Sequence, residues 1–351
     1  MFDICIIGAG VTGLSLLLLL KEAGVSPSRI AIIDPHFDGG DLARRWTSVP
    51  SNTPWSKTFQ TLRELCPSTP ISSSNDPDVS TPLIEVAELI RMAAASTLRT
   101  TRQVQGQATQ AAFSNLTHTW TVKVSTGSMT PGFIEAKVLI LAVGAEPRSL
   151  DLPIPSIPLE IALDPLRLKR YVHPGQRVIV FGTMHSGTLV IRNAAMDCSG
   201  VVTALYNSEQ PFYWARDGAY DGIKREAADV ADAILAKQIH AELVSTKDVA
   251  AVIRASATAD WVVYAMGFMA RELPLPFQVD GIERSGRPYD GHTGALTELP
   301  AAWGFGTAYP NRAPDGMHWD VSVAAFLVHM KGQLPAILQL IPSSLNTNMI
   351  P

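Results

Sequence analysis

The chain opens on a glycine-rich turn that lies between two apolar segments. Residues 4–7 form a short apolar run that predicts a buried strand, and residues 14–23 predict a helix. Between them Gly8, Gly10 and Gly13 have the GxGxxG spacing, which permits a tight turn, close approach of a pyrophosphate and close packing of the helix on the strand. The N–H groups at the start of such a helix attract phosphate. The stretch therefore predicts a dinucleotide site, with a purely structural turn as the alternative.

A second apolar run supports the dinucleotide interpretation. Residues 29–34 predict a neighbouring strand that ends in Asp34, an acid 21 residues after Gly13. In a dinucleotide-binding unit a carboxylate at about this spacing binds the ribose hydroxyls. The opening of the chain thus predicts a unit with the pyrophosphate at the glycines and the ribose at Asp34.

Composition limits what else the protein can be. The 351 residues are enough for two domains, and 46% hydrophobic and 17% charged residues describe a globular chain. The net charge of −4 gives no indication of a nucleic-acid partner. The three cysteines form no CxxC pair, which argues against a dithiol redox centre or a metal site and fits a reducing, cytoplasmic location. The apolar residues 16–20 are too few to cross a membrane.

The opening pattern returns in the second half of the chain. Residues 176–193 repeat it with Gly182 and Gly187, although Met184 stands where the middle glycine would be. Apolar strands end in a glycine at Gly144 and again at Gly267, as expected where a parallel strand meets a cofactor. This internal repetition predicts an α/β fold with two Rossmann-like three-layer domains.

The other segments predict how these units are connected. Residues 35–57 predict a long loop and residues 67–82 a surface excursion, because both are rich in Gly, Pro, Ser or other polar residues. Helices are predicted for residues 83–98, 221–238 and 316–329, the last with Asp320 as its N-terminal cap. Residues 100–140 predict strands.

The constellation resembles the two-dinucleotide-binding-domain flavoproteins, and among them the flavin-containing monooxygenase and amine N-hydroxylase branch. The resemblance is carried by Gly39-Gly40 followed by Trp46, by the stretch from Ser51 through Asn52 to Lys57, and by the stretch from Asp260 to Phe268. It implies an FAD-binding domain formed by residues 1–155 and 271–351. A smaller NAD(P)-type nucleotide domain, residues 156–270, would be inserted between these two parts.

The resemblance also implies which residues bind the cofactors. Those expected at FAD or at the second nucleotide are Gly8, Gly10, Val11, Thr12, Gly13, Asp34, Pro35, Arg45, Trp46, Asn52, Val104, Ala142, Gly144, Gly182, Ser186, Gly187, Gly306, His318, Asp320 and Val321. The flavin ring would lie between Asn52 and the helix that begins near His318. Whether NADPH or NADH binds the second turn stays open, because Met184 replaces a glycine and no Arg follows residues 201–206.

Three side chains are candidates for a catalytic role: Asn52, His185 and His318. The amide of Asn52 offers a donor and an acceptor to flavin, with turn formation as the alternative. His185 lies at a predicted helix start, where a neutral imidazole contacts flavin or acts as a base, with capping or packing as the alternative. At Trp46 the alternatives are a wall of the flavin site and an anchor for the loop.

The preferred function is an FAD-dependent monooxygenase. Its substrate would be a small organic specialised metabolite, with a nitrogen-containing compound as one option. Reduced flavin would react with O₂ to give a C4a-hydroperoxide in a dry pocket. The alternative is an oxidase or dehydrogenase reduced directly by its substrate, with a vestigial NAD(P) domain. A nucleotide-sensing flavoprotein without catalysis is a third class, and a homo-oligomer stays open.

Overall fold

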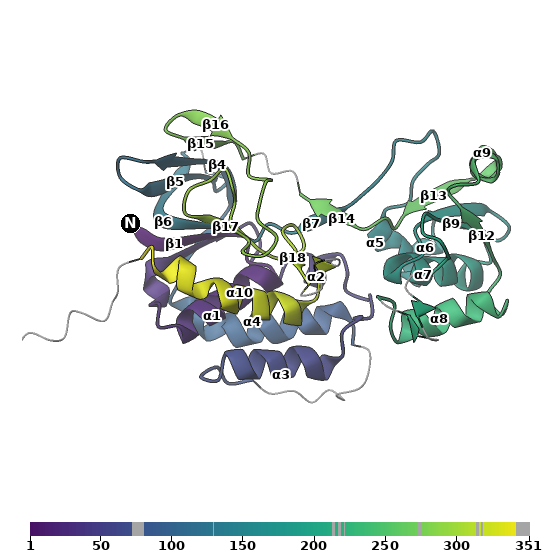
Figure 1. Cartoon of the computed structure of the whole chain (residues 1–351), viewed down its shortest axis with the longest axis horizontal. Coiled ribbons are helices and arrows are strands. Elements are labelled where there is room, and N and C mark those ends of the chain that lie inside the picture. Colours follow the sequence, from purple (N-terminus) through teal and green to yellow (C-terminus); the bar gives the residue numbers. More distant parts are fainter. Residues whose placement is uncertain are drawn as a thin grey trace, which may run out of the picture.

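A large sheet is built around the apolar strand at the start of the chain (Figure 1). The computed structural model describes residues 1–71, 81–128, 130–212, 215–216, 219–220, 222–271, 275–313, 316 and 319–341. In it β1 (Phe2–Ile7) pairs in parallel with β2 (Ile30–Asp34) and β6 (Gly132–Leu141). Ile4 and Ile6 face the helices, whereas Cys5 and Ile7 face a second cluster, which explains why the strand is buried on both sides.

The sheet continues on both sides of this centre. Its order is β16-β15-β4-β5-β6-β1-β2-β3, and β17 pairs in parallel with β6. The additional strands are β3 (Arg102–Gln105), β4 (Gln107–Ser114), β5 (Thr119–Ser125), β15 (Phe277–Val279), β16 (Ile282–Arg284) and β17 (Ala302–Gly304). Alternate residues of β5 are buried, as expected for an antiparallel strand with one face on a core.

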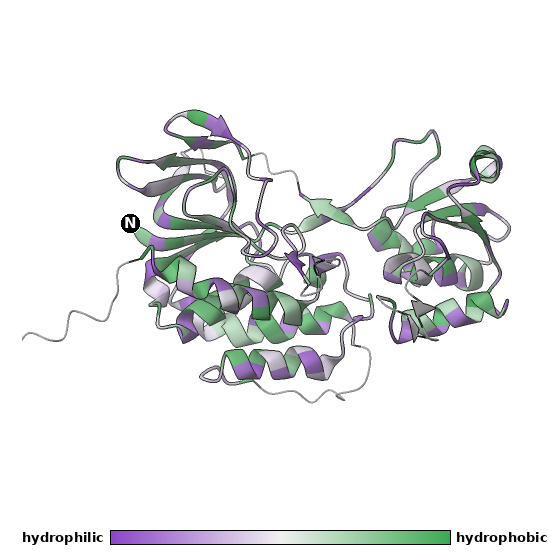
Figure 2. Ribbon diagram, viewed as in Figure 1, coloured by the Kyte–Doolittle hydropathy of each residue, from purple (hydrophilic) through white to green (hydrophobic). Residues whose placement is uncertain are grey.

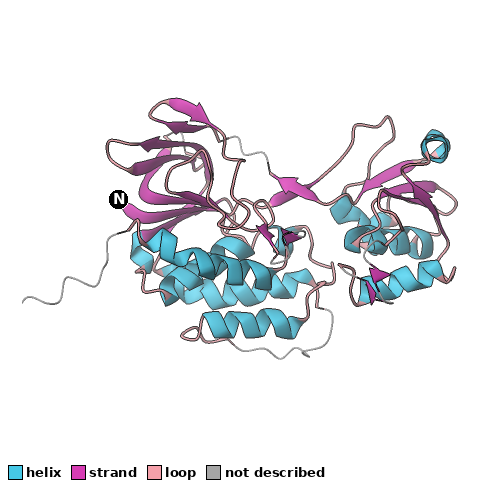
Figure 3. Ribbon diagram, viewed as in Figure 1, coloured by secondary structure: helices cyan, strands magenta, loops and turns pink. Residues whose placement is uncertain are grey.

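Helices cover one face of this sheet (Figure 3). They are α1 (Val11–Glu22), α3 (Trp55–Leu65), α4 (Leu83–Arg99) and α10 (Val323–Leu338). The apolar residues 16–20 of α1 are almost completely buried, because α1 packs between the sheet, α4 and α10. The run is a core helix. Among the described residues, no helix has the length and apolar character needed to cross a bilayer.

A second, smaller sheet forms the other half of the molecule. Four parallel strands lie in the order β12-β9-β8-β13, namely β12 (Ala241–Ser245), β9 (Val201–Tyr206), β8 (Arg177–Phe181) and β13 (Trp261–Tyr264). One face carries α5 (Leu159–Ala162), α6 (Pro165–Leu168), α7 (His185–Arg192) and α8 (Glu226–Leu235), and the other carries α9 (Val249–Thr258). This is a three-layer arrangement, in which both the strands and the helices carry apolar residues (Figure 2).

Short elements join the two halves. The strands β7 (Ala145–Pro147) and β14 (Phe268–Ala270) pair antiparallel and form the ribbon between the sheets in Figure 1. The remaining short elements are α2 (Asp41–Arg44), β10 (Ala215–Arg216), β11 (Ala219–Tyr220), β18 (Asn311–Arg312) and β19 (Trp319–Asp320), with a 3-10 turn at Pro27–Arg29 and a π-helix at Asn193–Asp197.

The structure confirms the predicted fold class and corrects several elements. The helix predicted for residues 83–98 is α4, whereas the helix at 226–235 is shorter than predicted. The long-loop prediction for residues 35–57 is wrong at its end, because Trp55 is buried and stacks on Phe59 as the first residue of α3. The domain limits at 155/156 and 270/271 stay a proposal.

The start of the last helix was also predicted wrongly. Residues 319–320 form β19, which pairs with β18, and α10 begins only after Ser322. Asp320 is therefore not the cap. The hydroxyl of Ser322 accepts the hydrogen bond from the N–H of Ala325 instead.

Candidate functional site

The first glycine turn is a cradle that tolerates no side chain at two positions. Gly8 has φ +105°, and a Cβ there would lie 2.3 Å from the carbonyl oxygen of Ala142 at the end of β6. A Cβ on Gly13 would lie 1.9 Å from the carbonyl oxygen of Gly8. The turn thus brings the start of α1 directly onto the ends of β1 and β6. Backbone N–H groups at a helix start of this kind are suited to binding phosphate.

Two further glycines complete this cradle. Gly10 forms an isolated parallel bridge with Gly39, and a Cβ on Gly40 would lie 2.8 Å from the Cα of Gly10. On the C-terminal side, a Cβ on Gly306 would lie 2.5 Å from the Oγ1 of Thr12. The first turn of α1 contains no acidic residue, so its positive end is not neutralised by its own side chains.

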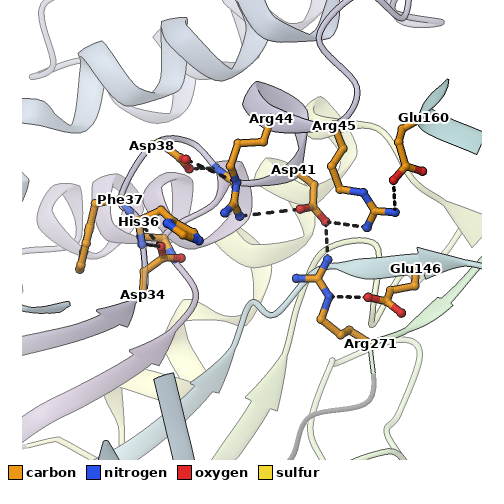
Figure 4. Close-up of polar contacts among 12 residues, drawn as sticks. Asp34, His36, Phe37, Asp38, Asp41, Arg44, Arg45, Glu146, Glu160 and Arg271 are labelled. Atoms are coloured by element: carbon orange, nitrogen blue, oxygen red, sulfur yellow. Dashed lines mark hydrogen bonds and ion pairs between the residues drawn. The ribbon is translucent and has the colours of Figure 1, made fainter. Parts of the chain in front are cut away.

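Asp34 ends β2 beside this turn and is already bound to backbone (Figure 4). Its Oδ2 accepts a hydrogen bond from the N–H of Ala9 at 2.7 Å, and its Oδ1 accepts from the N–H groups of His36 (2.7 Å) and Phe37 (2.9 Å). A carboxylate has about four acceptor positions. Asp34 therefore fixes the turn that follows β2, a role that the sequence did not indicate, and retains acceptor capacity for a ribose.

The other predicted residues of the first site lie around the same strand ends. Val11 and Thr12 begin α1, Pro35 follows β2, and Val104 on β3 pairs with Ile33 of β2. Gly144 follows β6 with φ +73°. The residues predicted from sequence spacing therefore lie together at the carboxyl ends of the parallel strands, and their role as a cofactor site stays a prediction.

Of the predicted site residues near the C-terminus, Asp320 and Val321 lie in the described part of the chain. Asp320 accepts a 3.4 Å hydrogen bond from the Nδ2 of Asn311, and Val321 is exposed just before the cap of α10. His318, predicted as both a cofactor contact and a catalytic residue, lies outside the described residues.

The second glycine turn repeats the geometry of the first. Gly182 has φ +101°, and its Cβ would lie 2.3 Å from the carbonyl oxygen of Ala265, while a Cβ on Gly187 would lie 2.0 Å from the carbonyl oxygen of Gly182. Met184 precedes α7 with φ −82° and ψ −169°, close to the −72° and −175° of Gly10. Its side chain packs against the core of the half built on the smaller sheet β12-β9-β8-β13, which we call the small domain. Ser186 lies half-buried in the first turn of α7.

Arg45 and Trp46 contact the small domain rather than the first glycine turn. Arg45 donates to the Oε1 of Glu160 on α5 at 3.1 Å. Trp46 is buried in the core cluster of the small domain, where its ring meets Phe268 edge to face at 5.6 Å between centroids. The anchoring role that was the alternative for Trp46 is the one this packing supports.

Asn52 also contacts the small domain. Its Nδ2 donates to the carbonyl oxygen of Gly222 and its Oδ1 accepts from the N–H of Lys224, both at 3.1 Å. Donor and acceptor of the amide are thus both engaged by the loop before α8. The position of Asn52 beside flavin stays a prediction.

His185 also links the small domain to the segment around Asn52. Its Nε2 lies 3.1 Å from the carbonyl oxygen of Pro50, and since a carbonyl only accepts, Nε2 carries the proton. Burial lowers the pKa of the imidazole, although the bond to Pro50 and the charge of Glu226 raise it. A pKa below 6.5 leaves the ring uncharged at pH 7, and its buried Nδ1 has no partner in the part of the chain that the structure describes.

An ionic network that the sequence did not reveal holds the connecting ribbon (Figure 4). Arg271, directly after β14, donates to the Oδ2 of Asp41 at 2.7 Å and to the Oε1 of Glu146 on β7 at 3.2 Å. Arg45 lies 4.0 Å from the same Oδ2 of Asp41. Asp41 and Arg271 are 230 positions apart, so no sequence spacing could have paired them.

A cavity of about 610 Å³ adjoins this network. Ala270, Arg271, Phe277, Arg284 and Tyr309 are among the residues that line it. The N–H of Arg271 donates to the carbonyl oxygen of Gly144 at 3.4 Å, which places one end of the cavity next to the end of β6. Among the described residues, no group of three His, Cys, Asp or Glu side chains could hold a metal ion.

The chain was compared with known families, sequences and solved structures. No model of a known protein family matches the chain. The sequence is 27% identical, over an alignment 379 positions long, to the monooxygenase AgnR1 of Paecilomyces divaricatus, and the alignment covers 93% of this chain and 94% of the relative. The structure is similar to the bacillithiol disulfide reductase of Bacillus cereus, with a TM-score of 0.63, 14% identity and 96% and 99% of the two chains covered. It is also similar to a flavin-containing monooxygenase of Stenotrophomonas maltophilia, with a TM-score of 0.61, 14% identity and 97% and 98% covered.

The chain has the fold of the two-dinucleotide-binding-domain flavoproteins. The resemblance seen in the sequence is confirmed at this level, and both solved structures are matched over nearly their whole length. The two glycine turns are the features of this chain that a dinucleotide requires of such a fold.

Proposed function

We propose that the protein is an FAD-dependent monooxygenase that uses NAD(P)H and O₂ on a small organic substrate. The observation that carries the proposal is the repeated cradle. Gly8 and Gly182 have φ values of +105° and +101°, and each lies with its missing Cβ 2.3 Å from a strand-end carbonyl. Two turns built alike, each at the ends of parallel strands in its own sheet, support two dinucleotides in one molecule.

The residues around the first turn fit FAD. Gly8, Gly10 and Gly13 leave backbone free for a pyrophosphate, and the start of α1 offers it N–H groups. Asp34 has acceptor capacity left for the adenosine ribose. When bound, FAD would supply the redox and O₂ chemistry that side chains lack. The protein would bind it, orient it and exclude water.

The backbone conformation of the second glycine turn is suited to a nicotinamide nucleotide. Gly182 and Gly187 reproduce the first cradle, and the extended backbone at Met184 matches that at Gly10. The neutral His185 does not add the positive charge that would favour a 2′-phosphate.

The monooxygenase relative supports oxygenation over the oxidase alternative, because it aligns with nearly the whole chain. A nitrogen-containing substrate, a cytoplasmic location and a homo-oligomer stay predictions from the sequence. The substrate would bind in the cavity lined by Arg271 and Tyr309, since this cavity lies near the end of β6.

Anaerobic rapid mixing of the purified protein tests the proposal. NADPH or NADH added alone should bleach the flavin absorbance. Bleaching by candidate substrates with both nicotinamide nucleotides inert would instead establish the oxidase or dehydrogenase alternative. A protein isolated without FAD that also fails to bind added FAD would contradict the cofactor assignment.

A further inference from the structure

We propose that Asn52 is an interdomain positioning residue. It belongs to a clasp, residues 45–52, which holds the small domain so that its glycine turn faces the FAD domain at a fixed angle. The inference rests on the proposed function, because it gives the clasp a part in the reduction of FAD by NAD(P)H.

The amide of Asn52 is bound at both ends to backbone of the small domain. Nδ2 reaches the carbonyl oxygen of Gly222 and Oδ1 receives the N–H of Lys224, each at 3.1 Å. Two bonds from one planar amide fix its orientation as well as its distance. Because the partners are backbone atoms, the contact depends on the path of the chain before α8 and not on a mobile side chain.

Other clasp residues bind the small domain at different elements. Arg45 binds Glu160 on α5, and Pro50 receives the hydrogen bond from His185, the first residue of α7. Together with the Asn52 contact these are three attachment points on three separate elements. Several attachment points on different parts of the small domain restrict its rotation about the clasp more than one contact would.

Apolar burial strengthens the attachment. Trp46 and Val49 are 7% and 5% exposed and belong to the core cluster of the small domain. Trp46 packs edge to face on Phe268 of the connecting strand β14. Domains of one chain move relative to each other by default unless their interface is large and hydrophobic, and opening this interface would expose an indole.

The clasp is anchored equally well in the FAD domain. The N–H of Trp46 donates to the carbonyl oxygen of Asp41 at 3.1 Å, and the carbonyl oxygen of Val49 accepts from the N–H of Leu83 at 2.9 Å. The N–H of Ser51 donates to the carbonyl oxygen of Thr81 at 2.8 Å. The segment therefore transmits the position of α2 and α4 to the second glycine turn.

A fixed domain angle matters for hydride transfer. Reacting atoms must come within about 3–3.5 Å, and an error of about 1 Å can cost on the order of a hundredfold in rate. Loss of a positioning contact should thus slow flavin reduction at saturating NAD(P)H and leave FAD affinity unchanged. This separates Asn52 from the residues of the first glycine turn, whose loss should release FAD.

Covalent replacement of the contact tests the inference. Asn52→Cys and Lys224→Cys are combined in the full-length holoprotein and joined with a short bis-maleimide. The three native cysteines are buried and should be spared. Each single variant treated with the reagent, and Asn115→Ala as a control for a surface amide far from the clasp, complete the set. The measurements are the rate of flavin reduction at saturating NAD(P)H and the Kd of FAD.

The positioning role predicts a specific pattern. Asn52→Ala and the unlinked double variant should reduce about tenfold more slowly than wild type. Their FAD affinity should stay within about twofold of wild type, because the first cradle is intact, and Asn115→Ala should match wild type. Cross-linking should restore most of the rate to the double variant.

Three results would overturn the inference while leaving the proposed function standing. These are a wild-type rate in Asn52→Ala, a cross-linked protein that NAD(P)H cannot reduce because its domains must rotate, and a double variant that stays slow when linked because Asn52 acts directly on flavin. A wild-type protein that NAD(P)H fails to reduce would instead overturn the proposed function, and the inference with it.

Discussion

The Nε2 of His185 donates a hydrogen bond to the carbonyl oxygen of Pro50, which lies 135 residues earlier in the chain, at 3.1 Å. The bond joins the start of α7 in the small domain to the clasp, residues 45–52. It also fixes the tautomer, because the proton must be on Nε2. The glycine turn of the smaller sheet is thereby tied to the half of the molecule that contains the large sheet.

His185 should make stability depend on pH. Burial lowers its pKa below the ordinary 6.5, so the unfolded chain binds a proton more readily than the folded protein. The stabilisation is present above 6.5 and is lost as pH falls through the folded pKa. In His185→Gln, which can still donate to Pro50, the midpoint of urea unfolding should fall less between pH 7 and pH 5 than in wild type.

The control for this titration is His329→Gln, since burial also lowers the pKa of His329, in α10. Each variant should remove part of the acid sensitivity, and the double variant should remove more than either. An unchanged pH dependence in His185→Gln would show that the imidazole is not held neutral.

Substitutions in the two glycine turns should have different effects. Gly8→Ala should abolish the yellow colour, because its Cβ would meet the Ala142 carbonyl at 2.3 Å. Gly182→Ala should retain FAD and lose reduction by NAD(P)H, since its clash is with Ala265 at 2.3 Å. Gly24→Ala is the matched control, with φ +86° but open space around its Cβ. Flavin content and reduction rate are the measurements; loss of FAD in Gly182→Ala and Gly24→Ala as well would indicate general misfolding.

Asp41 and Arg271 should be energetically coupled. Their 2.7 Å bond joins α2 to the connecting ribbon, and both side chains are mostly shielded from water. A double-mutant cycle with Asp41→Asn and Arg271→Gln should give a coupling of about 1 kcal/mol, within the range for partly buried ionic hydrogen bonds. Thermal unfolding supplies the values, and the same cycle with Arg271 and the more exposed Glu146 should give less. If the effects of Asp41→Asn and Arg271→Gln on the free energy of unfolding were additive, the two side chains would not be coupled.

Met184→Gly should change the Kd of NAD(P)H by less than about threefold. The extended backbone at Met184 is open to any residue, and its side chain packs on the small-domain core. Glycine would therefore remove packing without opening the turn. Isothermal titration would measure this, and a gain in affinity of tenfold or more would show that the methionine side chain obstructs the pyrophosphate.

The glycine turns could be predicted from the sequence because their geometry is local. Only glycine tolerates the φ of Gly8 and Gly182, so the spacing of the glycines determines the path of the chain. Asp34 was located for the same reason, at the end of the second strand. Its bonds to Ala9, His36 and Phe37 depend on how the turn closes, which spacing alone does not show.

The contacts of the clasp could not be predicted, because they depend on which domain a loop packs against. Arg45, Trp46 and Asn52 suit a cofactor site and an interdomain contact equally well by residue type. The start of the last helix was missed for a related reason. The ring of Trp319 lies 3.9 Å from the guanidinium of Arg312, a tertiary contact that favours the β18–β19 pair over a longer helix.

The measurement that tests the central claim most directly is the fate of labelled oxygen. The holoprotein, reduced by NAD(P)H, is supplied with ¹⁸O₂ and a substrate, and the product is analysed by mass spectrometry. A monooxygenase incorporates one labelled oxygen atom into the product and releases the other as water. An oxidised product without label, formed together with labelled hydrogen peroxide, would contradict the account.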